Sequence, residues 1–363
     1  MKSKLLTTMI VTAMSLGIST AHAEDELNIV SWGGAYTMSQ VKAYHEPWTK
    51  KTGQKIVNID KSANALSGLR AQVESGNVTW DLIDILPSDA IVACDEGLVE
   101  EIDYDELLAP APDGTPASED FIEGSLTGCF IPQIVYSNVV AYNKDMFKEG
   151  KTPSKIADVF DLENFPGKRA LNKKPLNNLE WALIADGVAP EEVYATLETE
   201  AGIERAFAKL DTIKDQVIWW EEGAQPPQLL ADKEVAFASA YNGRIFNAAV
   251  NEKQPFEIIW DGQVFELDGW VVPKGKLDKV KDYLKFATDT QRLADQSKYI
   301  SYGPARQSSD QYVTNHAETG IEMKTHMPTY EPNFKTALPK NDEFWADNGD
   351  ELAERFNAWL AKH

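Results

Sequence analysis

The sequence has few of the residues that build metal sites or disulfide frameworks. Its 363 residues include only two cysteines, Cys94 and Cys129, and five scattered histidines. A two-cysteine metal site or a catalytic thiol would need histidine partners, and no histidine lies near either cysteine in the sequence. In an oxidising compartment a lone cysteine pair is expected to form one disulfide. We therefore predict a Cys94–Cys129 bond, no metal site and no cofactor.

Positive charge and long apolar runs are also scarce. The chain has 35 Lys and Arg against 57 Asp and Glu, which gives a net charge of −22. So acidic a surface would repel nucleic acid and anionic lipid, which excludes both as partners. Apart from the first residues, no stretch approaches the length and apolar content of a membrane span.

The first 23 residues have the pattern of a secretory signal peptide. Lys2 and Lys4 precede a short apolar stretch, and Ala21-His22-Ala23 is typical of a cleavage site. We expect cleavage after Ala23 and release of a soluble monomer into the periplasm.

Signatures of catalysis are missing as well. The sequence contains no G-x-S-x-G, no H-E-x-x-H, no P-loop and no calcium-binding loop. Carboxylate pairs such as Asp81/Asp84 and Glu221/Glu222 occur, but an acidic chain has such pairs by chance. A glycosidase needs two carboxylates facing each other across a cleft, which a sequence cannot show. We expect a protein that is not an enzyme, with a secreted hydrolase as a minor alternative.

Strands and helices alternate along the chain. Apolar runs at 27–32, 56–59 and 81–86 are typical of strands, and each is followed by a helical pattern. This alternation predicts an α/β fold with a parallel sheet covered on both faces. A second α/β unit begins near residue 165. Extended segments at 135–142 and 266–270 are expected to carry the chain between the two units.

These patterns predict two lobes joined by a hinge of two crossovers. After the signal peptide, lobe 1 is expected to comprise residues 24–135 and 267–305. Lobe 2 is expected to comprise residues 136–266 and 306–363.

The segment from Ser239 to Trp270 holds candidates for ligand contact. Tyr241 and Arg244 directly follow an apolar strand, at the strand end where open α/β sheets bind their ligands. Arg244 presents a planar fork for an anionic group, and Asp268 can pair with an ammonium. The alternative is a surface arginine, a solvated aspartate and tryptophans that belong to the core.

Aromatic residues recur at or near the predicted strand ends. Core packing explains one or two of them, but so many suit a cleft that stacks on alkyl chains and cations. These residues are Trp32, Tyr36, Trp219, Trp220, Tyr241, Trp260 and Trp270.

Over essentially its whole length the chain resembles the solute-binding proteins of ABC importers, specifically the spermidine/putrescine-binding family. The resemblance rests on LNIVSWGGAY, WDLIDILPSDA, CDEGLVEEID, FPGKRAL, IWWEEGAQPPQLLADKEVAFASAYNGR, LDGWVVPKG and YGPA, in this order. It implies a type II periplasmic-binding fold, whose lobes close around a ligand. It also implies delivery of that ligand to a membrane permease driven by an ATPase. A protein that presents its ligand to a chemoreceptor would share the fold.

The resemblance also implies site residues. Trp32, Tyr36 and Ser88 would line the cleft, and Asp268 would hold an amine. Together with the pattern-based candidates, the predicted ligand-binding residues are Trp32, Tyr36, Ser88, Trp219, Trp220, Tyr241, Arg244, Asp268 and Trp270, with Gln133 or Tyr136 near the crossover.

Two departures from the family bear on the ligand. Glu266 stands where the family has a tryptophan, and 172–178 (NKKPLNN) replaces a stretch whose acidic pair binds further amines. A cleft arginine would also repel polyamines, which carry no anionic group. We therefore expect a small amine ligand, with an ω-amino acid such as γ-aminobutyrate ahead of putrescine or spermidine. Betaines, opines and other amino acids are the alternatives.

Overall fold

The computed structural model describes residues 26–147 and 151–362. The predicted signal peptide, with its cleavage after Ala23, lies outside the described residues. None of the helices in the described part of the chain combines the length and the apolar composition needed to cross a membrane.

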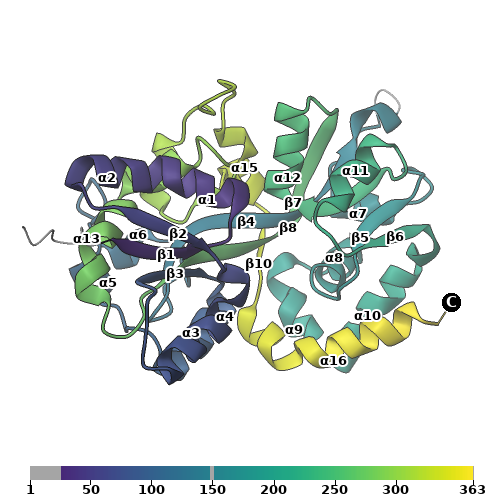
Figure 1. The fold of residues 1–363 in the computed structure, drawn as a ribbon. Coiled ribbons are helices and arrows are strands. Elements are labelled where there is room, and N and C mark those ends of the chain that lie inside the picture. The colour runs from purple at the N-terminus through teal and green to yellow at the C-terminus, as the bar shows by residue number, and fades with distance from the viewer. Residues whose placement is uncertain (1–25, 148–150, 363) are drawn as a thin grey trace, which may run out of the picture.

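A single ten-stranded sheet runs through the molecule (Figure 1). Its strands pair in the order β2-β1-β3-β8-β4-β7-β5-β6, and β10 and β9 add to β8 and β4. The bounds are β1 Leu27–Ser31, β2 Ile56–Asp60, β3 Leu82–Ile85, β4 Ile131–Asn143, β5 Arg169–Asn172, β6 Val217–Trp220, β7 Phe237–Tyr241, β8 Phe256–Val271, β9 Gly303–Pro304 and β10 Leu338–Pro339.

Lobe 1 is built on the parallel strands β2, β1 and β3. Its helical segments are α1 Gly34–Gln40, η1 Val41–His45, α2 Glu46–Thr52, η2 Ser62–Asn64, α3 Ala65–Glu74, α4 Pro87–Asp95, α5 Tyr104–Leu107, α6 Ala117–Asp120, α13 Leu277–Ala287, α14 Thr290–Gln296 and η7 Gln307–Tyr312.

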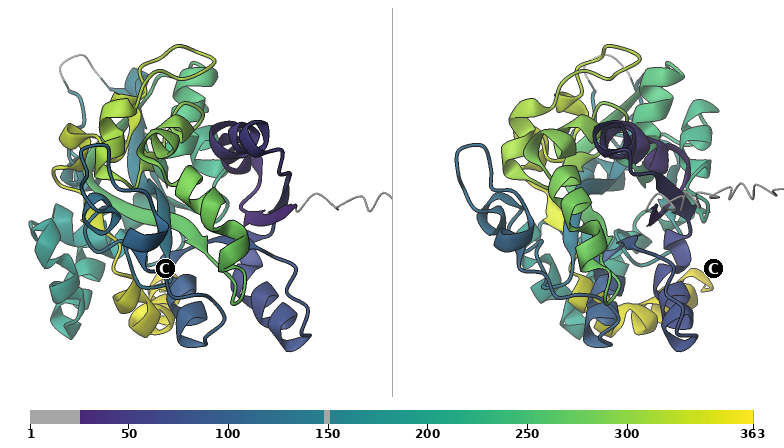
Figure 2. Two further views of the ribbon diagram at one scale, coloured as in Figure 1. Left: turned by 90° about the vertical axis from the view of Figure 1, so that its left-hand side faces the viewer. Right: turned by 60° about the vertical axis from the view of Figure 1, so that its left-hand side comes forward.

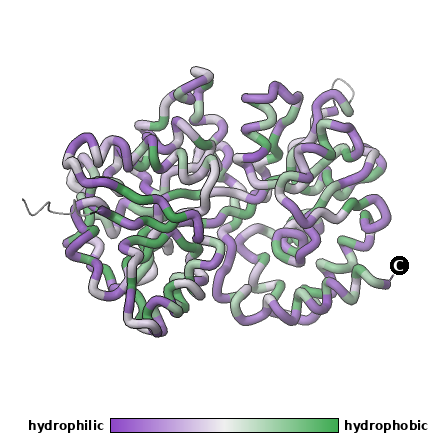
Figure 3. Tube along the Cα trace, viewed as in Figure 1, coloured by the Kyte–Doolittle hydropathy of each residue, from purple (hydrophilic) through white to green (hydrophobic). Residues whose placement is uncertain are grey.

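Both faces of β1 and β3 are buried, because apolar side chains fill alternate positions on both sides of these two strands, whereas the residues of the edge strand β2 are half-buried or exposed. Ile29 and Leu82 face a core completed by the helices at 34–52 and 277–296, which lie close together in Figure 2. Their neighbours Val30 and Ile83 face the opposite core, under α3 and α4. Figure 3 shows the hydrophobic residues concentrated along these strands. The predicted α/β sheet with helices on both faces is confirmed.

Lobe 2 repeats this arrangement around the parallel strands β7, β5 and β6. Its helical segments are η3 Lys144–Met146, α7 Ile156–Phe160, α8 Asn178–Ala185, η4 Pro190–Glu192, α9 Val193–Leu197, α10 Glu200–Asp211, η5 Lys214–Gln216, α11 Gln225–Ala231, α12 Asn242–Phe246, η6 Asn247–Asn251 and α16 Asp342–Leu360. The short segments η8 Lys324–His326 and α15 Glu331–Phe334 lie before α16.

Two long antiparallel strands, β4 and β8, connect the lobes (Figure 1). β8 pairs with β3 in lobe 1, and β4 pairs with β7 in lobe 2. The register between them shifts between Asn138 and Val140, where the pair passes from one lobe to the other. Gly269 is required for this pairing, because a Cβ there would lie 2.3 Å from the carbonyl oxygen of Ile131. The structure therefore has both of the predicted crossovers.

The chain returns to lobe 2 later than residue 306, where the sequence placed the boundary. Buried Arg306 forms an ion pair with Asp120 of lobe 1, with 3.0 Å between Nε and Oδ2. Ser308 donates to the same carboxylate at 2.6 Å. A buried guanidinium requires such a partner, so the segment that carries it stays on lobe 1. By contrast, α16 packs on lobe 2 through Phe356 and Trp359.

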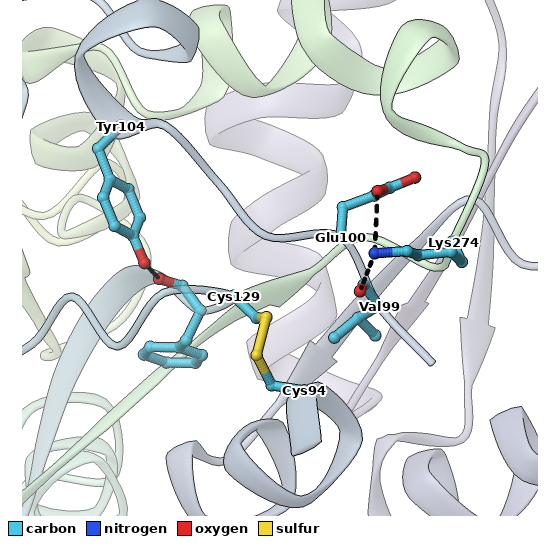
Figure 4. The surroundings of a disulfide bond; sticks show 7 residues. Cys94, Val99, Glu100, Tyr104, Cys129 and Lys274 are labelled. Atoms are coloured by element: carbon cyan, nitrogen blue, oxygen red, sulfur yellow. Dashed lines mark hydrogen bonds and ion pairs between the residues drawn. A yellow bond between two sulfur atoms is a disulfide. The ribbon is translucent and has the colours of Figure 1, made fainter. Parts of the chain in front are cut away.

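The predicted disulfide is confirmed. It joins Cys94 at the end of α4 to Cys129, just before β4, across a sequence separation of 35 residues (Figure 4). Its neighbour Tyr104 donates a hydrogen bond to the carbonyl of Phe130 at 2.9 Å. The bond therefore ties the loop between α4 and β4 to the base of the crossover strand.

Replacing both cysteines by serine is expected to lower the free energy of unfolding of lobe 1 by about 3–4 kcal/mol, because the 35-residue loop is no longer closed in the unfolded chain. Urea unfolding of both proteins, with and without reductant, measures this. Reductant should destabilise the wild type and leave the double variant unchanged. Equal stability of the two oxidised proteins would contradict the expectation.

Candidate functional site

A cleft of about 1030 Å³ lies between the lobes. Lobe 1 contributes the loop after β1 and the segment at 299–302, and lobe 2 contributes α11, α12 and η6. Among the residues that line it are Trp32, Gly33, Tyr36, Gln228, Gly243, Arg244, Asn247, Tyr299, Tyr302 and His316.

The end of β1 positions Trp32 and Tyr36 in this cleft. Gly33 has a φ of 82°, and a Cβ there would lie 3.1 Å from Cγ of Asp60. Glycine therefore allows the chain to turn sharply into α1. The Tyr36 hydroxyl donates to Oε1 of Gln133 at 2.6 Å, which fixes the ring. The structure thus brings both of these predicted residues to the cleft.

Four tyrosines form a continuous aromatic wall. The ring centroids of Tyr36 and Tyr302 are 6.3 Å apart, and those of Tyr302 and Tyr136 are 6.0 Å apart. Tyr136 in turn lies 6.1 Å from Tyr241 of lobe 2. The wall therefore runs from lobe 1 across the crossover strand into lobe 2. Sequence reasoning had assigned Tyr302 only to a turn, and its position just before a Gly-Pro pair was the available signal.

A pair of buried carboxyl groups lies at the lobe 1 end of the wall. Asp268 on β8 is 5% exposed and Asp84 on β3 is fully buried. Asp84 pairs with Trp270 across β3 and β8, so Asp268, two residues away, lies on the same face of the sheet, and the two carboxyls are close enough for each to shift the pKa of the other. Asp84 also accepts from Nε2 of Gln40 at 2.5 Å and from the Tyr36 hydroxyl at 3.3 Å. In the described part of the chain no lysine or arginine forms an ion pair with either carboxyl.

Burial raises the pKa of Asp84 to about 7. Burial, followed by the neighbouring Asp84, raises the pKa of Asp268 well above its usual range. Two carboxylates in contact cannot both ionise in a site that excludes water. Asp84 is a functional candidate that the sequence analysis missed, because the Asp81/Asp84 pair was attributed to chance. The signal was a second acid inside an otherwise apolar strand.

Arg244 lies on the lobe 2 side of the same cleft, in α12 directly after β7. Its side chain runs past Gly223, where a Cβ would lie 3.2 Å from its Nε, and past the ring of Tyr241. The residue is exposed, and within residues 26–147 and 151–362 no hydrogen bond or ion pair occupies its guanidinium. The cleft therefore has a basic group in its lobe 2 lining, beside the exposed acids Asp232 and Glu252, and a buried acidic pair behind its lobe 1 lining.

The family of bacterial extracellular solute-binding proteins matches residues 43–329 of this sequence. The chain belongs to this family.

Relatives of this solute-binding protein match almost its full length. The gamma-aminobutyric acid-binding protein of Pseudomonas aeruginosa is 36% identical over 347 residues, 95% of this chain and 94% of its own. A GABA receptor of known structure is 30% identical, with a TM-score of 0.74 over 93% of this chain and 98% of its own. The PBP MotA from A. tumefaciens B6, solved with glucopine, is 30% identical, with a TM-score of 0.72 over 92% and 99%. The predicted resemblance and the two-lobed fold are confirmed.

Three predicted tryptophans lie in the cores of the solute-binding protein and not in its cleft. Trp219 packs edge-on against Phe356 and Trp359 of α16, at 5.4 and 5.8 Å. Trp220 is buried on the other face of β6 and donates to Oγ of Ser239 at 3.0 Å. These assignments were wrong because consecutive strand residues point to opposite faces, and helices cover both faces here.

Trp270 is fully buried in lobe 1, with its ring centroid 5.8 Å from Tyr44 and 6.2 Å from Tyr283. Trp270 is close in the sequence to Asp268, but its ring is buried beneath the sheet. Ser88 occupies the first turn of α4 and is not among the residues that line the 1030 Å³ cleft. Its predicted role rests on the resemblance alone.

Glu266, which stands where the family has a tryptophan, also lies close to the aromatic wall. Its carboxylate accepts from Asn138 at 2.8 Å and from Lys340 at 3.1 Å. Its charge contributes, after burial, to raising the pKa of Tyr136. Lys340 compensates this charge, so among the acids near the wall in the described residues, Asp268 and Asp84 are the buried ones with no ion pair. In the described residues no group of three or more potential ligands is placed to hold a metal ion.

The buried pair makes the stability of the empty protein depend on pH. A carboxyl whose pKa is raised on folding stabilises the fold below its unfolded pKa, near 4, and loses that contribution as the pH rises through about 7. From pH 4.5 to 7.5 the wild type should lose roughly 2–4 kcal/mol relative to Asp84→Asn. Urea unfolding of both proteins across this range measures the difference. Parallel stability curves would refute it.

Proposed function

We propose that this solute-binding protein captures a small ω-amino acid, of the class of γ-aminobutyrate, in the cleft between its lobes. The observation that carries the proposal is the position of the exposed Arg244 in the cleft lining on lobe 2, opposite Trp32 and Tyr36 of lobe 1, behind which the buried carboxyl of Asp268 lies. The relatives that bind GABA support the same ligand class.

The acidic side suits an ammonium group. Asp268 retains 5% exposure and has no ion pair in the described part of the chain, so its carboxyl can accept from a ligand that enters the cleft. The tyrosine rings beside it offer their faces to the cation and the alkyl chain. A buried carboxylate gains most from a partner that brings positive charge into the same dry site.

The basic side suits a carboxylate. The planar guanidinium of Arg244 can donate two parallel hydrogen bonds to it, and its donors are unoccupied in this structure. A diamine would place its second ammonium near this arginine and be repelled. The departure at residues 172–178, where the family's additional acidic pair is missing, points in the same direction.

A bulkier zwitterion is the second candidate. The cleft volume of about 1030 Å³ exceeds what a four-carbon amino acid needs, and MotA binds glucopine on a related scaffold. An opine would keep the contacts of its charged groups with Asp268 and Arg244 and fill more of the cleft.

In this proposal the protein performs no chemistry. The ligand bridges two lobes that are connected by β4 and β8, and contacts to both lobes favour a closed form. Recognition of the closed form by an ABC permease in the inner membrane would release the ligand for transport. Export after cleavage at Ala23 would place the protein in the periplasm, as a monomer. Co-purification with the permease tests this step.

The ligand class is tested by calorimetric titration of ligand-stripped protein with γ-aminobutyrate, putrescine, spermidine, glycine betaine and an opine. Saturable 1:1 binding that is strongest for γ-aminobutyrate or the opine supports the proposal. Binding of the polyamines alone would overturn it and would require Arg244 to turn away from the ligand.

Arg244→Ala is expected to weaken binding of γ-aminobutyrate at least 30-fold, because a charge-assisted bidentate contact contributes about 2 kcal/mol or more. Arg244→Lys should recover part of this affinity. Butylamine, which lacks the carboxylate, should bind the wild type and Arg244→Ala equally weakly. Arg205→Ala is the matched control, since Arg205 is a lobe 2 arginine whose Nε lies 2.6 Å from Asp186, outside the cleft. Unchanged γ-aminobutyrate affinity in Arg244→Ala would refute the carboxylate contact.

A further inference from the structure

We propose that Asp84 and Asp268 share one proton in the empty cleft, and that binding of the ligand's ammonium group expels this proton to solvent. Asp84 is thereby assigned a role in ligand binding, although it lies behind the carboxyl that faces the cleft. The inference rests on the proposed function, because it requires a cationic group beside Asp268.

The hydrogen bonds around the pair show where the proton resides. Both Gln40 and Tyr36 donate to Asp84, at 2.5 Å and 3.3 Å, and such donors stabilise an ionised carboxylate. Asp268 accepts from the backbone N–H of Gly269 at 2.9 Å, and this bond and the neighbouring Trp32 lower its pKa less than burial and Asp84 raise it. It therefore carries the shared proton and donates it toward Asp84. Burial and its charged neighbour both keep Asp268 protonated.

The other titratable groups around the pair do not supply this proton. Tyr36, Tyr44, Tyr136, Tyr283 and Tyr302 surround it from α1, η1, β4, α13 and the loop before β9. Burial raises the pKa of each, so all five stay neutral at physiological pH. Each tyrosine can donate or accept a hydrogen bond without changing its charge.

The charged groups nearby are Glu266, Asp60 and Arg244. Lys340 forms an ion pair with Glu266, with 3.1 Å between Nζ and Oε2, and Thr37 donates to Asp60 at 3.2 Å. Arg244 acts across the cleft on Tyr302 and Tyr241. Asp84 and Asp268 thus form the buried acidic pair in this cleft that has no cation beside it.

An ammonium that enters the cleft changes this balance. A neutral Asp268 offers the ammonium only a hydrogen-bond acceptor. An ionised Asp268 offers it a full negative charge in a site without water. The cation therefore favours loss of the proton, and the pair with its ligand holds two negative charges and one positive charge. One proton leaves for each ligand bound, wherever the empty pair holds one.

Proton release makes affinity depend on pH. By linkage, each released proton strengthens binding up to tenfold per pH unit while the empty pair is protonated. Because the proton resides on Asp268, whose pKa is raised well above its usual range, this slope should continue through neutrality. γ-Aminobutyrate keeps both of its own charges between pH 5.5 and 8.5, so any slope belongs to the protein.

The experiment is calorimetric titration with γ-aminobutyrate in buffers of different ionisation enthalpy, at pH 5.5, 7.0 and 8.5. We expect release of close to one proton at pH 5.5 and at pH 7.0, and a smaller count at pH 8.5 only to the extent that the empty pair has already lost its proton. The dissociation constant should fall at least tenfold from pH 5.5 to 7.0. Binding without proton release at any pH overturns this inference and leaves the proposed function intact. No binding at any pH overturns both.

Asp84→Asn assigns the effect to the pair, since it keeps the shape of the side chain but removes the second charge. Burial still favours the protonated form of Asp268 in this variant, but without the second charge its empty cleft should lose the proton at lower pH. Proton release at pH 7.0 and 8.5 should therefore fall below the wild-type count, and the pH slope of affinity should flatten there. Full release by a folded Asp84→Asn protein would overturn the role of Asp84. The wild-type proton count remains decisive if this variant does not fold.

Glu180→Gln is the matched control. Glu180 is a fully buried carboxyl in lobe 2 whose pKa burial raises to about 7. It accepts from Trp345 at 2.9 Å and from Tyr194 at 3.2 Å, outside the cleft lining. This variant should release as many protons on ligand binding as the wild type. If Glu180→Gln released fewer protons than the wild type, the release would come from buried carboxyls in general and not from the Asp84/Asp268 pair.

Discussion

The pairing of β4 with β8 is the constraint on which the rest of the molecule depends. The two strands continue through both lobes and give each lobe its central strands. The side chains of Tyr136 on β4 and Asp268 on β8 consequently lie behind the cleft, next to Tyr302 and Tyr36, which line it. Any rotation of one lobe against the other must bend these strands, close to the register shift at Asn138.

The same strand pair places a charged site where water is largely excluded. Asp268 follows from β8, and Asp84 from the neighbouring β3, whose register sets Asp84 opposite Trp270. Two acids are thus held together by backbone pairing and not by attraction between their side chains. Their mutual repulsion is tolerated because a proton compensates it. A binding site whose two carboxyls repel each other when ionised favours a ligand that carries a positive charge.

Ligand recognition and stability depend on different parts of the fold. In the proposed function, the tyrosine wall, Asp268 and Arg244 recognise the ligand. The helices on the outer faces, including α3, α10 and α16, contribute cores that do not reach the ligand. Trp219 packs against the core under α10 and α16, and Trp220 and Trp270 are buried in two further cores, so much of the aromatic content of the chain supports stability.

The sequence by itself determined the strand–helix alternation, the disulfide, the two crossovers and the position of Arg244 after a strand. These features depend on local spacing and on residues whose chemistry leaves few alternatives. Only the tertiary structure decided which aromatic rings face the cleft, since Trp219 and Trp220 alternate across one strand and Trp270 lies beneath another. It also decided that Asp84 meets Asp268, 184 positions further along the chain. Contacts of that kind arise from strand register, which no local pattern encodes.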